Sequence, residues 1–146
     1  MARPPDETIP GDEALYRSIS VDDVNGEDVL PQGVDLPRCS FNRSKHSKPE
    51  DVFVESRPND NGVAQVVPDG LPPPVPRASG EPYEFFAQDD PNPREDPEND
   101  AHCEIRIKPR GRPFSKNHEV NKSVLAKAKD ELARKLRVLI PPREVG

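Results

Sequence analysis

Apolar and polar side chains alternate without a break along residues 102–108, near the end of the chain. This period of two predicts a strand with one apolar face and one polar face, because successive side chains of a strand point to opposite sides. Three apolar residues fall on one face. The other face carries a polar row of His102, Glu104, Arg106 and Lys108.

After Pro113 the spacing of apolar residues changes to three and four, which predicts an amphipathic helix. Asn117 is the expected N-cap, and Pro141 and Pro142 end the pattern. A helix of about 22 residues is about 33 Å long, enough to cover one face of a small sheet. Its apolar positions are Val120, Val124, Leu125, Ala128, Leu132, Leu136 and Leu139.

Three earlier segments, residues 14–21, 39–43 and 62–67, predict further strands, and the first of them is supported by its β-branched and aromatic content. A helix is expected to begin near Pro49, with Ser47 as its N-cap. The sequence therefore predicts an α+β fold. We expect a small, mostly antiparallel sheet of three or four short strands, covered by one long C-terminal helix, with long irregular Pro-rich and acidic loops.

Composition limits the size of the hydrophobic core. The 146 residues include 20 prolines, and 33% are charged against 32% that are hydrophobic. We expect residues 1–12 to be a flexible tail and residues 13–143 to form a single small α+β domain. Within that domain, residues 68–100 are expected to be a Pro-rich and acidic irregular insertion.

Charge is divided along the chain. Residues 105–143 contain twelve Lys or Arg against three acidic residues, whereas residues 81–100 contain eight acidic residues. The acidic segment is expected to be a mobile loop that solvates the fold, or alternatively one that shields the basic segment from polyanions.

No apolar run approaches the length of a membrane span, and the first residues contain no apolar signal segment. With two cysteines only, we expect a cytoplasmic protein with free thiols and without a cofactor. A disulfide between Cys39 and Cys103 is the less favoured alternative.

Short pieces spread over most of the chain together resemble a set of small uncharacterised bacterial proteins found in gene neighbourhoods of conflict or phage-defence systems. That resemblance implies a role beside other proteins of the same system, but no established activity. The pieces are Leu15-Tyr16-Arg17, Ser40-Phe41-Asn42-Arg43, Pro49-Glu50-Asp51, Gly62-Val63-Ala64 and Ala101-His102.

A shorter resemblance lies at residues 108–113, Lys-Pro-Arg-Gly-Arg-Pro, which are similar to the core of an AT-hook. In such a hook an extended Arg-Gly-Arg lies in a narrow A·T minor groove. The resemblance implies DNA contact by Arg110, Gly111 and Arg112, with Lys116 and the basic helix adding affinity for phosphates. The alternative is a structural turn between the strand and the helix.

The residue types in the chain suggest two kinds of chemical site, a zinc site and a catalytic site. Four residues are of types that bind zinc, but His102 and Cys103 point to opposite sides of a strand, so no metal site is predicted. The four are Cys39, His46, His102 and Cys103.

Arg17, Ser40, His102 and Glu104 are the candidate catalytic residues. The order Arg17, Ser40, Glu104 is similar to that of ADP-ribosyltransferase-like enzymes, in which the Arg and Ser bind the nicotinamide nucleotide and the carboxylate orients the attacking group. A hydrolytic site built on Ser40 and His102 is equally open. The alternative for these side chains is a cross-strand polar network on a solvated sheet face.

These observations favour a non-enzymatic interaction or accessory protein of a bacterial, defence-related multi-protein system. Another protein of that system is the expected partner. DNA binding is the first alternative. A small nucleotide-acting or hydrolytic enzyme is the second.

Overall fold

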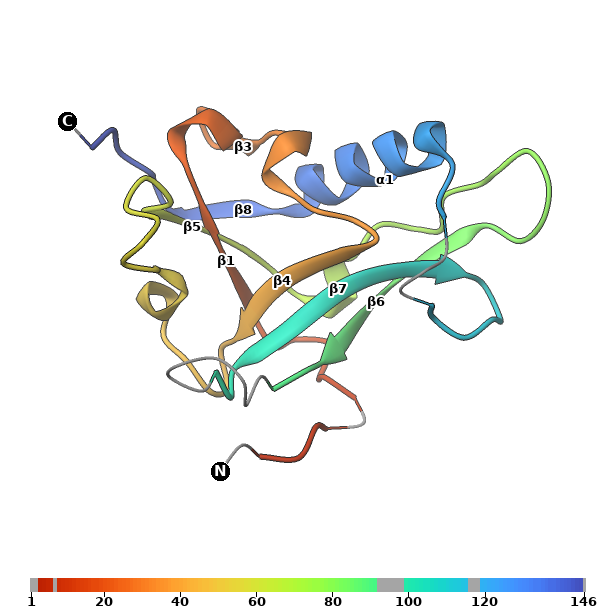
Figure 1. Ribbon diagram of the computed structural model, residues 1–146, viewed down its shortest axis with the longest axis horizontal. Helices are drawn as coiled ribbons and strands as arrows, with labels where there is room; N and C mark the ends of the chain where they lie inside the picture. The colour runs from red at the N-terminus through yellow and green to blue at the C-terminus, as the bar shows by residue number, and fades with distance from the viewer. Residues whose placement is uncertain (1–2, 7, 92–98, 116–118, 146) are drawn as a thin grey trace.

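A six-stranded antiparallel sheet forms the centre of the protein (Figure 1). The computed structural model describes residues 3–6, 8–91, 99–115 and 119–145. The strand order across the sheet is β6-β7-β4-β1-β5-β8. The strands are β1 (Leu15–Ile19), β4 (Arg38–Arg43), β5 (Gly62–Val66), β6 (Tyr83–Asp89), β7 (His102–Pro109) and β8 (Arg137–Ile140). A separate small hairpin consists of β2 (Val24–Asn25) and β3 (Asp28–Val29).

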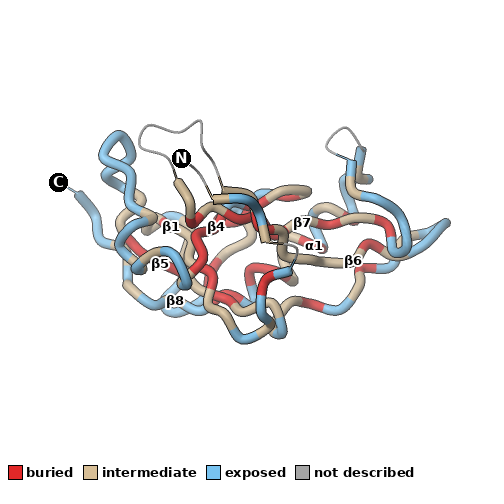
Figure 2. Tube along the Cα trace, turned by 90° about the horizontal axis from the view of Figure 1, so that it is seen from below, coloured by how far each residue is buried: buried red, intermediate tan, exposed pale blue. Residues whose placement is uncertain are grey.

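The α-helix α1 (Lys122–Lys135) packs against β3 and the short 3-10 helix η2 (Pro31–Gly33). Its buried side chains join those of the strands in one core, and buried positions gather along the middle of the molecule while the outer loops are exposed (Figure 2). Alternation places one side of β4 and β7 in this core, as the period of two predicts. The core residues of those strands are Cys39, Phe41, Cys103, Ile105 and Ile107.

The α+β class, the antiparallel sheet and the C-terminal helix are confirmed, but the expected three or four strands are wrong. The sheet has six, because β6 and β8 were not predicted. β6 lies in the segment expected to be irregular and acidic. Over its full length it pairs with β7, from Tyr83 opposite Pro109 to Asp89 opposite Cys103. Pairing with β7 and the burial of Tyr83 and Asp89 at the two ends therefore stabilise β6 as a strand, despite the acidic composition of its segment.

The helix is shorter than the sequence predicts. It has 14 residues and is capped by Asn121, whose Oδ1 accepts a hydrogen bond from the Ser123 amide at 2.9 Å. The expected cap, Asn117, lies outside the described residues. At Leu136 the chain becomes extended and continues as β8, which pairs with β5. Residues 137–140 also fit the helical period, but they pair with the edge of β5 and form a strand instead.

The helix expected near Pro49 is only a four-residue 3-10 helix, η3 (Pro49–Val52). Ser47 is not its N-cap, since Oγ of Ser47 donates to the carbonyl of Arg43 at 2.7 Å. Instead, the amide of Lys48 donates to Oδ2 of Asp51 at 2.8 Å. Among the described residues, no helix is long and apolar enough to cross a membrane.

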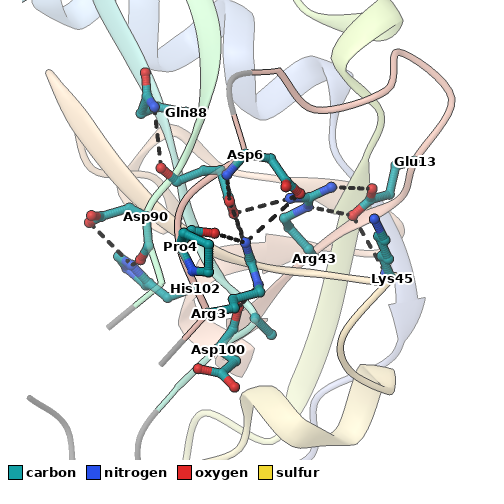
Figure 3. Close-up of polar contacts among 12 residues, drawn as sticks. Arg3, Pro4, Asp6, Glu13, Arg43, Lys45, Gln88, Asp90, Asp100 and His102 are labelled. Atoms are coloured by element: carbon teal, nitrogen blue, oxygen red, sulfur yellow. Dashed lines mark hydrogen bonds and ion pairs between the residues drawn. The ribbon is translucent and has the colours of Figure 1, made fainter. Parts of the chain in front are cut away.

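Arg43, the last residue of β4, is fully buried on the core side of the sheet, opposite Leu15 of β1. It donates two hydrogen bonds to Glu13, both at 2.8 Å, and one to Asp6 at 2.7 Å. Oδ1 of Asp89, at the end of β6, lies 3.2 Å from its Nη1. Arg3 also donates hydrogen bonds to Asp89. Figure 3 shows Arg3, Asp6 and Glu13 gathered around Arg43. The described part of the segment expected to be a tail therefore contacts the sheet.

These contacts keep the carboxylates ionised. Burial alone would raise the pKa of Asp89, but hydrogen bonds from Arg3, the Asp6 amide and Arg43 outweigh it and lower the pKa to about 2. Burial also opposes ionisation of Glu13. The hydrogen bonds and the charge of Arg43 outweigh burial and lower the pKa of Glu13 below its usual value. For Asp6 the hydrogen bond from Arg43 is the main cause of a lowered pKa. We define these residues, Arg3, Asp6, Glu13, Arg43 and Asp89, as the Arg43 cluster.

Replacing Arg43 by Met tests whether the fold depends on this cluster. Because Glu13 and Asp89 would lose their shared buried cation, we expect the free energy of unfolding to fall by about 3 to 5 kcal/mol in urea titrations. Arg57→Met is the matched control, since the Arg57 side chain is 62% exposed and lies 3.9 Å from Asp60. Equal stability of the two variants would contradict the prediction.

Acidification provides a second test. The carboxylates of the cluster have folded pKa values below their unfolded values, so their stabilisation is complete above about pH 4 and is lost as the pH falls through the folded values. Asp89, with a pKa of about 2, alone contributes roughly 2 kcal/mol. We expect the free energy of unfolding to fall between about pH 4 and pH 2, and to fall less steeply in Arg43→Met. A flat profile in the wild type would refute this account.

Candidate functional site

The site begins where β1 and β4 diverge. The two strands pair only at Leu15 with Arg43 and at Tyr16 with Asn42, and Figure 1 shows them spreading apart beyond those positions. Arg17 lies in the split. Its Nε donates to the Gly33 carbonyl at 2.8 Å and its Nη1 to the Ser40 carbonyl at 3.1 Å. The Ser40 carbonyl thus receives from the Arg17 guanidinium the hydrogen bond that the backbone of β1 would donate if the two strands were paired there.

A broad open hollow of about 1290 Å³ lies over this split. Three of the four candidate catalytic residues, Arg17, Ser40 and His102, line it. Its walls come from β1, β4, the η2 region, the segment after η3 and the residues that lead into β7. The charged, histidine and exposed apolar residues of these walls include Asp23, Asp35, His46, Asp51, Phe53, Val54, Glu55, Arg57, Asp60 and Asp100.

Ser40 and His102 are brought together by the pairing of β4 with β7. Ser40 lies opposite Glu104, and Asn42 lies opposite His102, so the side chains share the face of the sheet away from the core. Nε2 of His102 lies 3.2 Å from Oγ of Ser40. Ser40 is exposed, whereas the His102 side chain is 12% exposed.

Asp90, the residue after β6, orients the His102 ring. Its carbonyl oxygen lies 2.7 Å from Nδ1, and its carboxylate Oδ2 lies 3.4 Å from the same atom (Figure 3). The Asp90 amide donates to the His102 carbonyl at 3.1 Å, which fixes the two main chains against each other. Because a carbonyl only accepts, Nδ1 carries the hydrogen of the neutral ring. Nε2 is then the acceptor that faces the Ser40 hydroxyl.

Glu104 is held by two arginines. Arg38 binds it with both Nε and Nη2, at 2.9 and 2.8 Å, and Arg106 binds it with Nε at 2.7 Å. Burial opposes ionisation, but these hydrogen bonds outweigh it, so the pKa of Glu104 lies below its usual value. Its charge is neutralised by this clamp, and its oxygens are engaged there.

Sequence reasoning named Arg17, Ser40, His102 and Glu104 as candidate catalytic residues. The structure brings Ser40 and His102 into contact, with Arg17 at the Ser40 main chain, and Glu104 does not line the hollow. It missed Asp90, which follows a strand that was itself not predicted. The adjacent pair Asp89-Asp90 was the available signal. In a strand end, neighbouring side chains point to opposite sides, and here Asp89 binds the Arg43 cluster while Asp90 faces His102.

The four zinc-type side chains do not converge. Cys39 and Cys103 are buried free thiols on the core side, and burial raises the pKa of both. His102 and His46 line the hollow on the other side. Ligand atoms of Asp90, His102 and Glu104 lie within 4.8 Å of one another. The two guanidinium groups on Glu104 oppose a cation there.

The AT-hook-like residues form a turn. The Arg112 amide donates to the Pro109 carbonyl at 3.1 Å, the Arg110 amide donates to the Pro82 carbonyl at 2.9 Å, and Gly111 has a φ of 75°. A positive φ favours glycine, which accounts for this residue in the turn. Arg110 and Arg112 are exposed, and Lys116 lies outside the described residues. DNA contact stays a prediction, and it requires this turn to become extended.

Comparison with known proteins adds no assignment. No family model, curated protein or solved structure matches the chain. The interpretation of the hollow therefore rests on its own geometry and charge.

The hydrogen-bonding state of His102 is directly measurable. We expect long-range ¹H–¹⁵N spectra at neutral pH to show the tautomer with hydrogen on Nδ1, because the Asp90 carbonyl accepts from that atom. His102→Gln assigns the signal by its disappearance, and His46 is a comparison ring in the same hollow. A His102 signal dominated by hydrogen on Nε2 would contradict the geometry.

Proposed function

We propose that this chain is an interaction protein whose hollow binds a basic segment of a partner polypeptide. The observation that carries the proposal is the combination of exposed apolar side chains with an acidic lining in one open depression. The resemblance to proteins of defence-related gene neighbourhoods supports a partner from the same multi-protein system.

The size and openness of the hollow favour a polypeptide over a small ligand. Small-molecule sites enclose roughly 300 to 1,000 Å³ and surround most of the ligand. This hollow encloses about 1290 Å³ and opens broadly to solvent. An extended segment of a partner can lie across such a depression while its flanks remain outside.

Two apolar side chains provide anchors. Phe53 is 38% exposed and Val54 is 39% exposed, and both line the hollow. An aromatic residue surrounded by polar groups is typical of the centre of a protein interface, where a few anchors contribute most of the affinity. Burial of these side chains by a partner removes apolar surface from water.

The charge of the lining indicates the charge of the partner. Among the described residues that line the hollow, six carry carboxylates and two carry guanidinium groups. Such an excess of negative charge attracts basic side chains and repels phosphate groups. The occupant is therefore a polypeptide segment with Lys or Arg residues flanking an apolar residue, and nucleic acid is disfavoured at this surface.

A double substitution of the anchors tests the proposal. We expect Phe53→Ser with Val54→Ser to retain at least about tenfold less partner than the wild type, since loss of central anchors costs 2 kcal/mol or more. Immobilised protein, host lysate and quantitative mass spectrometry provide the measurement. Leu139→Ser is the matched control, because Leu139 is 41% exposed and belongs to β8 at the far edge of the sheet.

Cross-linking identifies what occupies the hollow. A photoreactive phenylalanine analogue at Ser56, which lines the hollow, is expected to link to a segment with a net positive charge. Retention that is equal in the double variant, the Leu139 control and the wild type would refute the proposal. Cross-links to acidic segments or to nucleic acid would refute the assigned occupant.

A further inference from the structure

We propose that Ser40 is a nucleophile activated by His102, so that the hollow carries an acyl-transfer site that acts on carboxylic esters. This activity goes beyond partner binding and does not depend on it. The proposal rests on the arrangement of Ser40, His102 and Asp90.

The pair has the geometry of a nucleophile and its base. The distance of 3.2 Å between Oγ of Ser40 and Nε2 of His102 lies at the outer edge of hydrogen-bond reach, as is common before substrate binds. The Asp90 carbonyl at 2.7 Å fixes the hydrogen on Nδ1 and leaves the Nε2 lone pair facing the hydroxyl. Asp90 is a positioning residue, and its carboxylate at 3.4 Å faces the imidazolium that forms when Nε2 takes a proton.

The contact is not needed to satisfy buried polar atoms. Ser40 is exposed, so water can hydrogen-bond its hydroxyl without help from His102. His102, in contrast, is held by a ring contact and a main-chain contact to Asp90. An oriented ring aimed at an accessible hydroxyl is the arrangement that nucleophilic catalysis requires.

The carboxylate that lies directly opposite Ser40 on β7 is paired with two cations. Glu104, directly opposite Ser40, has its charge neutralised by Arg38 and Arg106. On the β1 side of β4, the Arg17 guanidinium binds the main-chain carbonyl of Ser40 through Nη1 at 3.1 Å and pairs with Asp35 through Nη2 at 3.1 Å. A tetrahedral oxyanion formed at Ser40 therefore has no uncompensated carboxylate directly opposite on β7.

The chemical steps balance without a cofactor. Nε2 of His102 takes the hydroxyl proton as Oγ of Ser40 bonds to the ester carbonyl carbon. The carbon–oxygen bond to the alcohol then breaks, and the leaving oxygen takes the proton from Nε2. Water next gives a proton to Nε2 as its oxygen attacks the acyl carbon. Release of the carboxylic acid returns that proton to Oγ of Ser40.

The lining of the hollow selects among esters. Its excess of carboxylates favours neutral or cationic acyl groups over anionic ones. We therefore infer an ester of a neutral or cationic acyl compound as the substrate class.

A fluorophosphonate probe and a neutral nitrophenyl ester test the proposal on the full chain. We expect the probe to modify Ser40 in the wild type, located by peptide mass mapping, and not to modify that peptide in Ser40→Ala. His102→Ala is expected to react at least about tenfold more slowly, because base assistance contributes roughly 10² to 10⁴. Added imidazole should partly restore the rate in His102→Ala, which a purely structural role of the ring would not produce.

Ser18→Ala is the matched control, since Ser18 also lines the hollow but lies on β1. We expect it to react like the wild type, and circular dichroism of each variant verifies folding. Modification no greater than in Ser40→Ala, or equal rates in wild type and His102→Ala, would overturn the proposal. Partner capture by Ser40→Ala separates this outcome from a failure of the binding proposal.

Discussion

The burial of Arg43 is the constraint on which the rest of the structure depends. A fully buried guanidinium is unstable unless carboxylates surround it, and these come from three distant places in the chain: Asp6, Glu13 and Asp89. The N-terminal segment is thereby fastened across the sheet. The end of β6 is fixed as well, because Asp89 is bound by both Arg43 and Arg3.

Fixing Asp89 also fixes the candidate site. The next residue, Asp90, leaves β6 on the other side of the sheet and orients the His102 ring. The end of β6 therefore contributes Asp89 to the ion cluster on the core side and Asp90 to the orientation of His102 on the open side, while the pairing of β4 with β7 brings Ser40 to the ring. Arg17 lies in the split between β1 and β4, where it bonds the carbonyls of Gly33 and Ser40 and lines the hollow.

The sequence predicted the elements whose pattern is local. β7 and the start of the polar row at His102 follow from alternation alone, and β5 follows from a short apolar run. β6 was missed because acidic and proline-rich flanks concealed its pairing. β8 was missed because Leu136 and Leu139 also fit a helical period, and only the free edge of β5 decides between the two. The choice between helix and strand for these residues depends on tertiary contacts, so the local sequence does not reveal it.

The sequence could reveal some residues of the site and not others. Ser40 and His102 are visible as residue types, and an antiparallel pairing of their strands was sufficient to bring them together. Asp90 was not visible, since its position depends on Asp89 reaching Arg43 across 46 residues of sequence. What distinguishes the Ser40–His102 pair is the third residue, and it is placed by an arginine on the opposite side of the sheet.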